Sequence, residues 1–161
     1  IIMWPFKKPS EEEREIKEKK KLIKSRLKFL KTERRAKSKV AKEIATDLLL
    51  SAAERKVGKL KGNNRINVEN EIINRLTLIY GKLCTKDWNK PENKELFKEV
   101  KKSINQPTKT WYPKSEDEKV GNLKTVNKEL IELIEEQTKL KDLLTRLKNK
   151  DLTALQEQIN E

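Results

Sequence analysis

We expect an all-α protein, with a long basic N-terminal helix followed by a helical bundle that ends in a long heptad helix. Three observations predict this class. Apolar residues recur every three or four positions along most of the chain, which is the period of a helix face. No stretch alternates as a strand does, and there is no Asn-Gly or Asp-Gly hairpin signal. Hydrophobic residues make up only 34% and charged residues 40% of the 161 residues, which is typical of helices with one narrow apolar stripe.

These patterns divide the chain into four parts. We expect an extended arm at residues 1–9, because Pro5 and Pro9 disfavour helix before them. A long basic helix is expected at residues 10–57, a loop at 58–67, and a helical bundle at 68–161.

The long basic helix is predicted to begin at Ser10, which has the capping-box spacing to Glu13. Its apolar seam is Ile16, Ile23, Leu27, Leu30, Ala41, Ile44, Leu48 and Ala52. The seam lapses at Arg34 and Lys37, so we expect a bend near residues 32–39, or a stretch where the helix leaves the protein body.

The bundle is predicted to contain helices at residues 68–86, from Pro91 to Ile104, and from Ser115 onward, with Asp151 capping a short final segment. The last long helix carries a heptad seam, with spacings that alternate between three and four. We expect self-association through this seam and through aromatic residues of the arm. The residues assigned to it are Trp4, Phe6, Leu130, Leu133, Leu140, Leu144 and Leu147. Trp88, near a helix end, is expected to lock the bundle.

Charge is concentrated in the first long helix. The chain has 39 Lys and Arg against 26 Asp and Glu, a net charge of +13, and residues 14–42 hold 14 basic and 3 acidic residues. Such an asymmetry indicates a polyanionic partner.

Within this helix the cations form a ridge about 100° round from the apolar seam and about 37 Å long at 1.5 Å per residue. The cationic ridge is Lys17, Lys21, Lys24, Lys28, Lys31, Arg35, Lys39 and Lys42. Arg26 and Arg34 lie off the ridge and are expected to add to the same nucleic-acid-binding surface. Because lysine is a point charge rather than a planar fork, we expect phosphate contacts that are independent of base sequence. Double-stranded DNA is the favoured partner and RNA the alternative.

Several chemistries are excluded by composition. The chain has no His, a single cysteine (Cys84) and four glycines. This rules out His-dependent nucleophile systems, His or thiolate zinc sites and an intrachain disulfide. We therefore expect a non-enzymatic protein without metal or cofactor, and we place Cys84 in the core. No apolar run is long enough to span a bilayer and no secretory signal is evident, so we expect a virion or intracellular location.

The order of these parts resembles that of the coat proteins of filamentous archaeal viruses. The resemblance lies in an arm with Trp4, Pro5, Phe6 and Pro9, a basic helix from Arg14 to Lys42, and a helical bundle after it. It implies that the basic helix wraps double-stranded DNA and that many copies assemble into a shell.

A second interpretation remains open on the same residues. A helical adaptor or assembly protein would present its basic face to an acidic protein, ribosomal RNA or an anionic membrane. We expect a membrane partner less, since a surface-seeking helix carries a denser apolar face.

Overall fold

The computed structural model describes residues 10–57, 63–105 and 117–160, with side chains over 10–54, 64–105 and 118–150. The helices are α1 (Glu11–Val57), α2 (Asn63–Thr85), α3 (Lys94–Asn105) and α4 (Asp117–Asn160), with a short 3₁₀ helix η1 (Pro91–Asn93) before α3. No strand occurs within these ranges. The prediction of an all-α protein whose first and last helices are long is confirmed.

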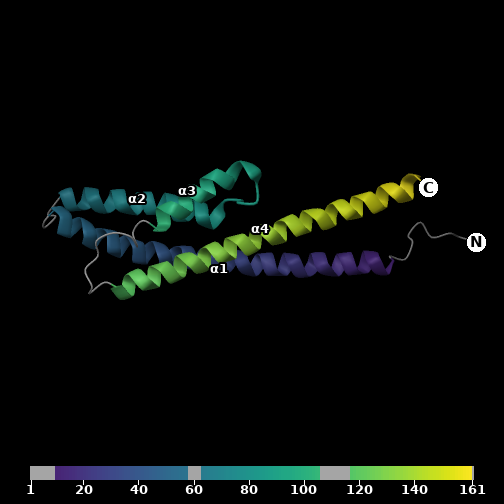
Figure 1. The fold of residues 1–161 in the computed structure, drawn as a ribbon, viewed down its shortest axis with the longest axis horizontal. Helices are drawn as coiled ribbons and strands as arrows, with labels where there is room; N and C mark the ends of the chain where they lie inside the picture. Colours follow the sequence, from purple (N-terminus) through teal and green to yellow (C-terminus); the bar gives the residue numbers. More distant parts are fainter. Residues whose placement is uncertain (1–9, 58–62, 106–116, 161) are drawn as a thin grey trace, which may run out of the picture.

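The helices form an elongated bundle in which α1 is the shared element (Figure 1). α4 crosses along α1 in the opposite direction, and α2 folds back along the C-terminal half of α1, with α3 beside it. The start of α1 and the end of α4 lie at the same end of the rod, beyond the reach of α2 and α3. α1 therefore has one flank toward α4, another toward α2, and a remaining face open to solvent.

The core follows the predicted seam of α1 and adds small residues to it. Leu30, Ala41, Ala45 and Leu48 of α1 are fully buried. Ala41, Ala45 and Leu48 belong to one apolar cluster with Leu76 and Leu83 of α2 and with Leu123, Leu130 and Ile134 of α4. The alanines leave room for neighbouring helices, because the separation of packed helices depends on side-chain size. Burying each leucine stabilises the fold by about 1.5–3 kcal/mol.

A buried polar group ties α2, α3 and α4 together. Asn127, 1% exposed, accepts a hydrogen bond from the Tyr80 hydroxyl at 2.8 Å and donates one to the Ile104 carbonyl at 3.0 Å. Ile104 lies in the last turn of α3, where carbonyls lack intrahelical partners. Asn127 therefore closes the end of α3 from inside the bundle.

α1 is continuous from Glu11 to Val57, so the helix is not broken near residues 32–39, and it does not leave the protein body there. Arg34 and Ser38 are buried there, and Lys37 forms an ion pair with Glu129 of α4. The buried face of α1 therefore continues through residues 32–39, but polar side chains occupy its core-facing positions there.

One predicted helix end is confirmed and two differ from the predictions. The capping box is confirmed, since the Glu13 N–H donates to Ser10 Oγ and the Ser10 N–H to Glu13 Oε2. α2 begins five residues earlier than expected, at Asn63. The separate final segment at Asp151 is wrong, because α4 continues to Asn160 through a stretch without Gly or Pro. The arm at 1–9, the segment 58–62 and Ser115 lie outside the described residues.

Trp88, which links α2 to η1, is 4% exposed and packs on Phe97 of α3 with ring centroids 5.1 Å apart. This contact confirms its predicted role in locking the bundle.

Candidate nucleic-acid interface

The cationic ridge lies on the solvent face of α1. Seven of its eight residues are exposed, and Lys42 is half-buried. Within the part of the chain that the structure describes, none of the eight forms an ion pair. No described carboxylate therefore pairs with this row of like charges. Repulsion within the row weakens the helix by a few tenths of a kcal/mol for each pair of charges on neighbouring turns.

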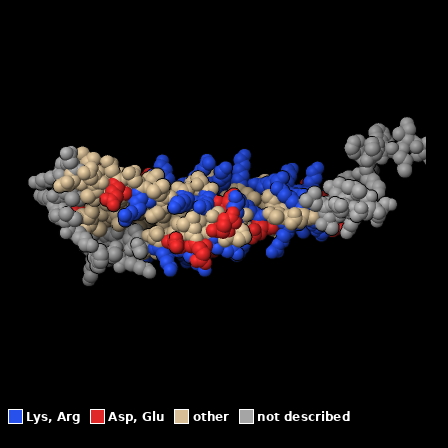
Figure 2. Space-filling model, turned by 90° about the horizontal axis from the view of Figure 1, so that it is seen from above, with Lys and Arg blue, Asp and Glu red and all other residues tan. Residues whose placement is uncertain are grey.

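The acidic residues of α4 that form ion pairs with α1 lie on a different flank of α1 from the ridge. Glu136 and Glu129 of α4 pair with Arg26 and Lys37 across the α1–α4 contact. Seen from above, Lys and Arg project along both long edges of the rod, whereas Asp and Glu gather in a few patches nearer its middle (Figure 2).

Arg26 belongs to this paired flank and not to the ridge. Its Nε and Nη2 donate to the two carboxylate oxygens of Glu136 at 2.8 and 3.1 Å, and its guanidinium lies 5.0 Å from the Phe29 ring centroid. The hydrogen bond with Glu136 raises the pKa of Arg26. A carboxylate therefore occupies the fork of Arg26 in this structure while its side chain stays exposed, and its assignment to nucleic-acid binding stays a prediction.

The placement of Arg34 on the exposed surface of α1 is corrected by the structure. Arg34 is only 3% exposed, and its side chain points into the bundle. Nε donates to the Leu83 carbonyl, Nη2 to the Lys86 carbonyl at 2.8 Å and Nη1 to Gln137 Oε1 at 2.8 Å. These carbonyls lie at the end of α2, where the helix dipole is negative and partners are missing.

Arg34 therefore caps α2 from inside the bundle, and it does not present its charge on the exposed face of α1 as predicted. Burial lowers the pKa of Arg34 to about 10, and the nearby Cys84 and Asp87 act in the opposite direction. The signal for this role was Gln137, a polar residue at a heptad position of α4 that meets Arg34 in the same layer.

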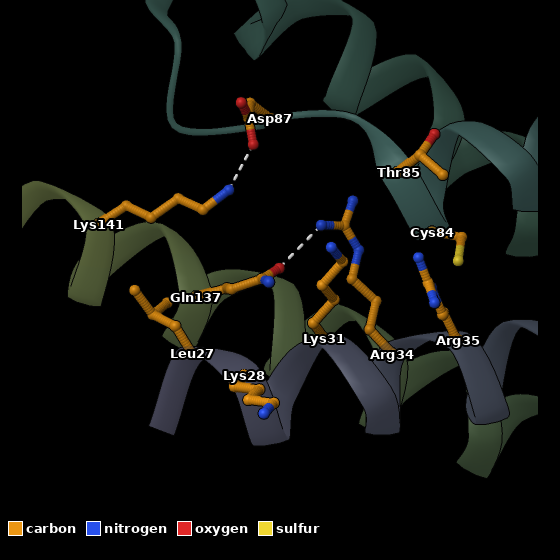
Figure 3. Close-up of a pocket in the computed structure, with 10 residues that line it drawn as sticks. All are labelled: Leu27, Lys28, Lys31, Arg34, Arg35, Cys84, Thr85, Asp87, Gln137 and Lys141. Carbon is orange, nitrogen blue, oxygen red and sulfur yellow. Dashed lines mark hydrogen bonds and ion pairs between the residues drawn. The ribbon is translucent and has the colours of Figure 1, made fainter. Parts of the chain in front are cut away.

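Beside Arg34 lies a cationic cleft between α1, the end of α2 and α4, with a volume of about 540 Å³ (Figure 3). Lys31, Arg34 and Arg35 extend into it from α1, while Lys141 of α4 forms an ion pair with Asp87 across it. The cleft is lined by Leu27, Lys28, Lys31, Arg34, Arg35, Cys84, Thr85, Asp87, Gln137 and Lys141.

Two features of the cleft differ from expectation or were missed. Cys84 is half-buried and lines the cleft, so its placement in the core is wrong. Lys141 and Asp87 were not singled out, because nothing in the sequence places either of them beside Lys31.

The residues assigned to self-association differ in how far they are buried within the chain. Leu130 is 0% exposed and packs within its own chain, so it is not available to a second copy. Leu133, Leu140, Leu144 and Leu147 are half-buried along α4, and Trp4 and Phe6 lie outside the described residues.

Two further searches of the described residues are negative. They contain no group of three or more side chains of the His, Cys, Asp or Glu types placed to hold a metal ion. None of the described helices combines the length and apolar character needed to cross a membrane.

Comparison with known protein families, curated proteins and solved structures finds no match to this chain.

Proposed function

We propose that this protein binds nucleic acid through the phosphate backbone, without enzymatic activity and without reading base sequence, as a coat or packaging protein. The observation that carries the proposal is the cationic ridge of α1, exposed and without ion pairs among the described residues. Glu129 and Glu136 of α4 pair with Lys37 and Arg26 and not with the ridge.

The dimensions of the ridge favour a duplex. A rigid helix holds its charges over about 37 Å, which is close to one turn of double-stranded DNA. Duplex DNA presents a phosphate charge about every 1.7 Å of axis, so each lysine has several phosphates within reach. The ridge itself consists of seven lysines and one arginine. That composition favours charge neutralisation over base reading.

Coating also requires contact between copies. Leu22 is 67% and Phe29 51% exposed on a face of α1 separate from both the ridge and the core. Together with the partly exposed stretch of α4 from Leu133 to Leu147, they provide the apolar surface for oligomer formation in this proposal.

The first test is the salt dependence of binding to a duplex of arbitrary sequence. If six to eight phosphates are neutralised, log K should fall with log[salt] at a slope of about −5 to −7. A slope near zero would remove the mechanism.

The second test compares two variants with the same loss of charge. Replacing Lys24, Lys28, Lys31 and Arg35 with Gln should lower affinity at least about tenfold on every duplex and reduce the slope by about 3–4. The matched control replaces four exposed lysines of α3 and α4, namely Lys94, Lys102, Lys124 and Lys128.

The control quartet should retain most of the affinity. Equal losses in the two quartets would mean that net charge acts without a defined ridge, and a loss confined to one duplex would mean base reading. Displacement of DNA by anionic vesicles at matched charge concentration would favour a membrane partner instead.

A further inference from the structure

The cationic cleft carries an excess of positive charge. Among its lining residues, five are cationic and only Asp87 is anionic, a formal net charge of +4. Asp87 is already paired with Lys141, which lowers the pKa of its carboxyl group through their hydrogen bond. Lys28, Lys31 and Arg35 at its rim are exposed and have no ion pair within the described ranges.

Arg34 directs further donors toward this space. A guanidinium has five N–H groups, and in the described structure the hydrogen bonds of Arg34 use three of them. One N–H on each terminal nitrogen remains at the cleft, on a charged side chain that is itself almost fully buried. Donors from α1 and a cation from α4 thus line one concave space (Figure 3).

We propose that this cleft, which shares Lys28, Lys31 and Arg35 with the ridge, is a binding site for an oligophosphate anion, meaning two or more linked phosphoryl groups such as pyrophosphate, tripolyphosphate or the phosphate chain of a nucleotide. A phosphate monoester carries about −1.5 to −2 charges at pH 7, so roughly two phosphoryl groups balance the cleft. Its volume of about 540 Å³ lies within the usual range for small-molecule sites. The proposal does not depend on nucleic-acid binding by the ridge.

The chain provides its own reporter for the test. Cys84 is the only cysteine, and it lines the cleft. The full chain is titrated with tripolyphosphate at constant ionic strength, while calorimetry gives the stoichiometry and iodoacetamide gives the alkylation rate of Cys84. We expect one-to-one, saturable binding that slows alkylation, and no slowing by sodium sulfate at the same ionic strength. An alkylation rate that follows ionic strength alone would overturn the site.

Two variants separate ligand binding from folding, because both break the same ion pair. Lys141→Gln removes a cation and should weaken tripolyphosphate binding about tenfold, whereas Asp87→Asn removes the carboxylate and should strengthen it several-fold. Lys128→Gln, with the same charge loss about 20 Å along α4 from Lys141 and outside both the ridge and the cleft, should leave the affinity unchanged. Equal effects of Lys141→Gln and Asp87→Asn, or of Lys141→Gln and Lys128→Gln, would contradict the proposal.

Nucleotides then define what the site recognises. ATP should bind about as tightly as tripolyphosphate and AMP at least about tenfold more weakly, since AMP carries one phosphoryl group. Equal binding of AMP and ATP would overturn an oligophosphate site. Loss of tripolyphosphate binding with DNA binding intact would refute this site alone, and the reverse result would refute the proposed function alone.

Discussion

Arg34 and Asn127 perform the same task for different helices. Each is a buried polar side chain whose hydrogen bonds close the C-terminal end of a helix, Arg34 for α2 and Asn127 for α3. A buried polar group left without a partner is costly, so these residues stabilise the bundle only while their acceptors stay in place.

The contribution of Arg34 is measurable by removing its donors. Arg34→Met keeps an unbranched chain but leaves the carbonyls of Leu83 and Lys86 and the amide oxygen of Gln137 without a donor. We expect a loss of about 2–3 kcal/mol in the free energy of unfolding, measured by urea denaturation followed by circular dichroism. The exposed neighbour Arg35→Met should change it by no more than about 0.5 kcal/mol. Similar losses at both positions would show that Arg34 does not cap α2.

Asn127 couples Tyr80 to Ile104, which gives a second prediction at this scale. Asn127→Leu leaves a buried hydroxyl and a carbonyl unpaired and should cost about 2 kcal/mol, while Tyr80→Phe should cost about 1 kcal/mol. The double variant should lose less than the sum of the two, because the orphaned hydroxyl is then absent. Strict additivity in a double-mutant cycle would exclude a direct interaction.

At the scale of elements, the contact between α1 and α4 combines an apolar seam with ion pairs along one flank. Glu12 pairs with Lys150 at 2.9 Å near the open end of the rod, Arg26 pairs with Glu136 further along, and Lys37 pairs with Glu129 beyond it. Hydrogen bonds from Lys150 and from Arg26 hold the pKa values of Glu12 and Glu136 below the usual value of 4.5. Neither α2 nor α3 covers the open end of the rod (Figure 1). The Glu12–Lys150 pair therefore adds to the contact between α1 and α4 at that end.

The lowered pKa values set the direction of a pH effect. A carboxylate whose pKa is lower in the folded state contributes stability above its unfolded pKa, and this contribution is lost as the pH falls through the folded value. The free energy of unfolding should therefore fall below pH 4.5, and the variant Glu12→Gln/Glu136→Gln should lose less of it than the native chain. Urea denaturation between pH 3 and 6 measures this difference at about 10 mM salt, where the Debye length is about 30 Å.

Glu132→Gln serves as the control, since Glu132 is exposed and forms no ion pair within the described part of α4. It should keep the pH dependence of the native chain. Full retention of that dependence in the double variant would show that the pairs contribute nothing.

For the whole molecule, the net charge of +13 and the cationic ridge oppose folding of the free protein. The four-Gln ridge variant (Lys24, Lys28, Lys31 and Arg35) removes five like-charge contacts between neighbouring turns. It should be more stable than the native chain by about 1 kcal/mol at low salt. The difference should shrink as salt screens the ridge, which thermal or urea unfolding at several salt concentrations would show. A ridge variant that is less stable at every salt concentration would mean that these cations have unrecognised partners.

A gain in stability together with a loss of DNA affinity would separate the function of the ridge from its structural effect. Bound polyanion stabilises only the folded chain, by about 2.7 kcal/mol at a ligand concentration one hundred times Kd. On the proposed function, the native chain should gain this stability from duplex DNA and the ridge variant should not.

The sequence by itself determined the helices, the apolar seam of α1 and the ridge beside it, because these features depend on spacings of three and four residues along one helix. Only the tertiary structure decided that Arg34 lies in the interior and bonds to the Leu83 carbonyl, that Arg26 pairs with Glu136, and that Lys141 pairs with Asp87 across a cleft that Cys84 also lines. These contacts join residues 49 to 110 positions apart. Whether a charged side chain at the edge of the apolar seam lies in solvent or in the core depends on where the neighbouring helix ends. The spacing of residues along one helix does not specify where another helix ends.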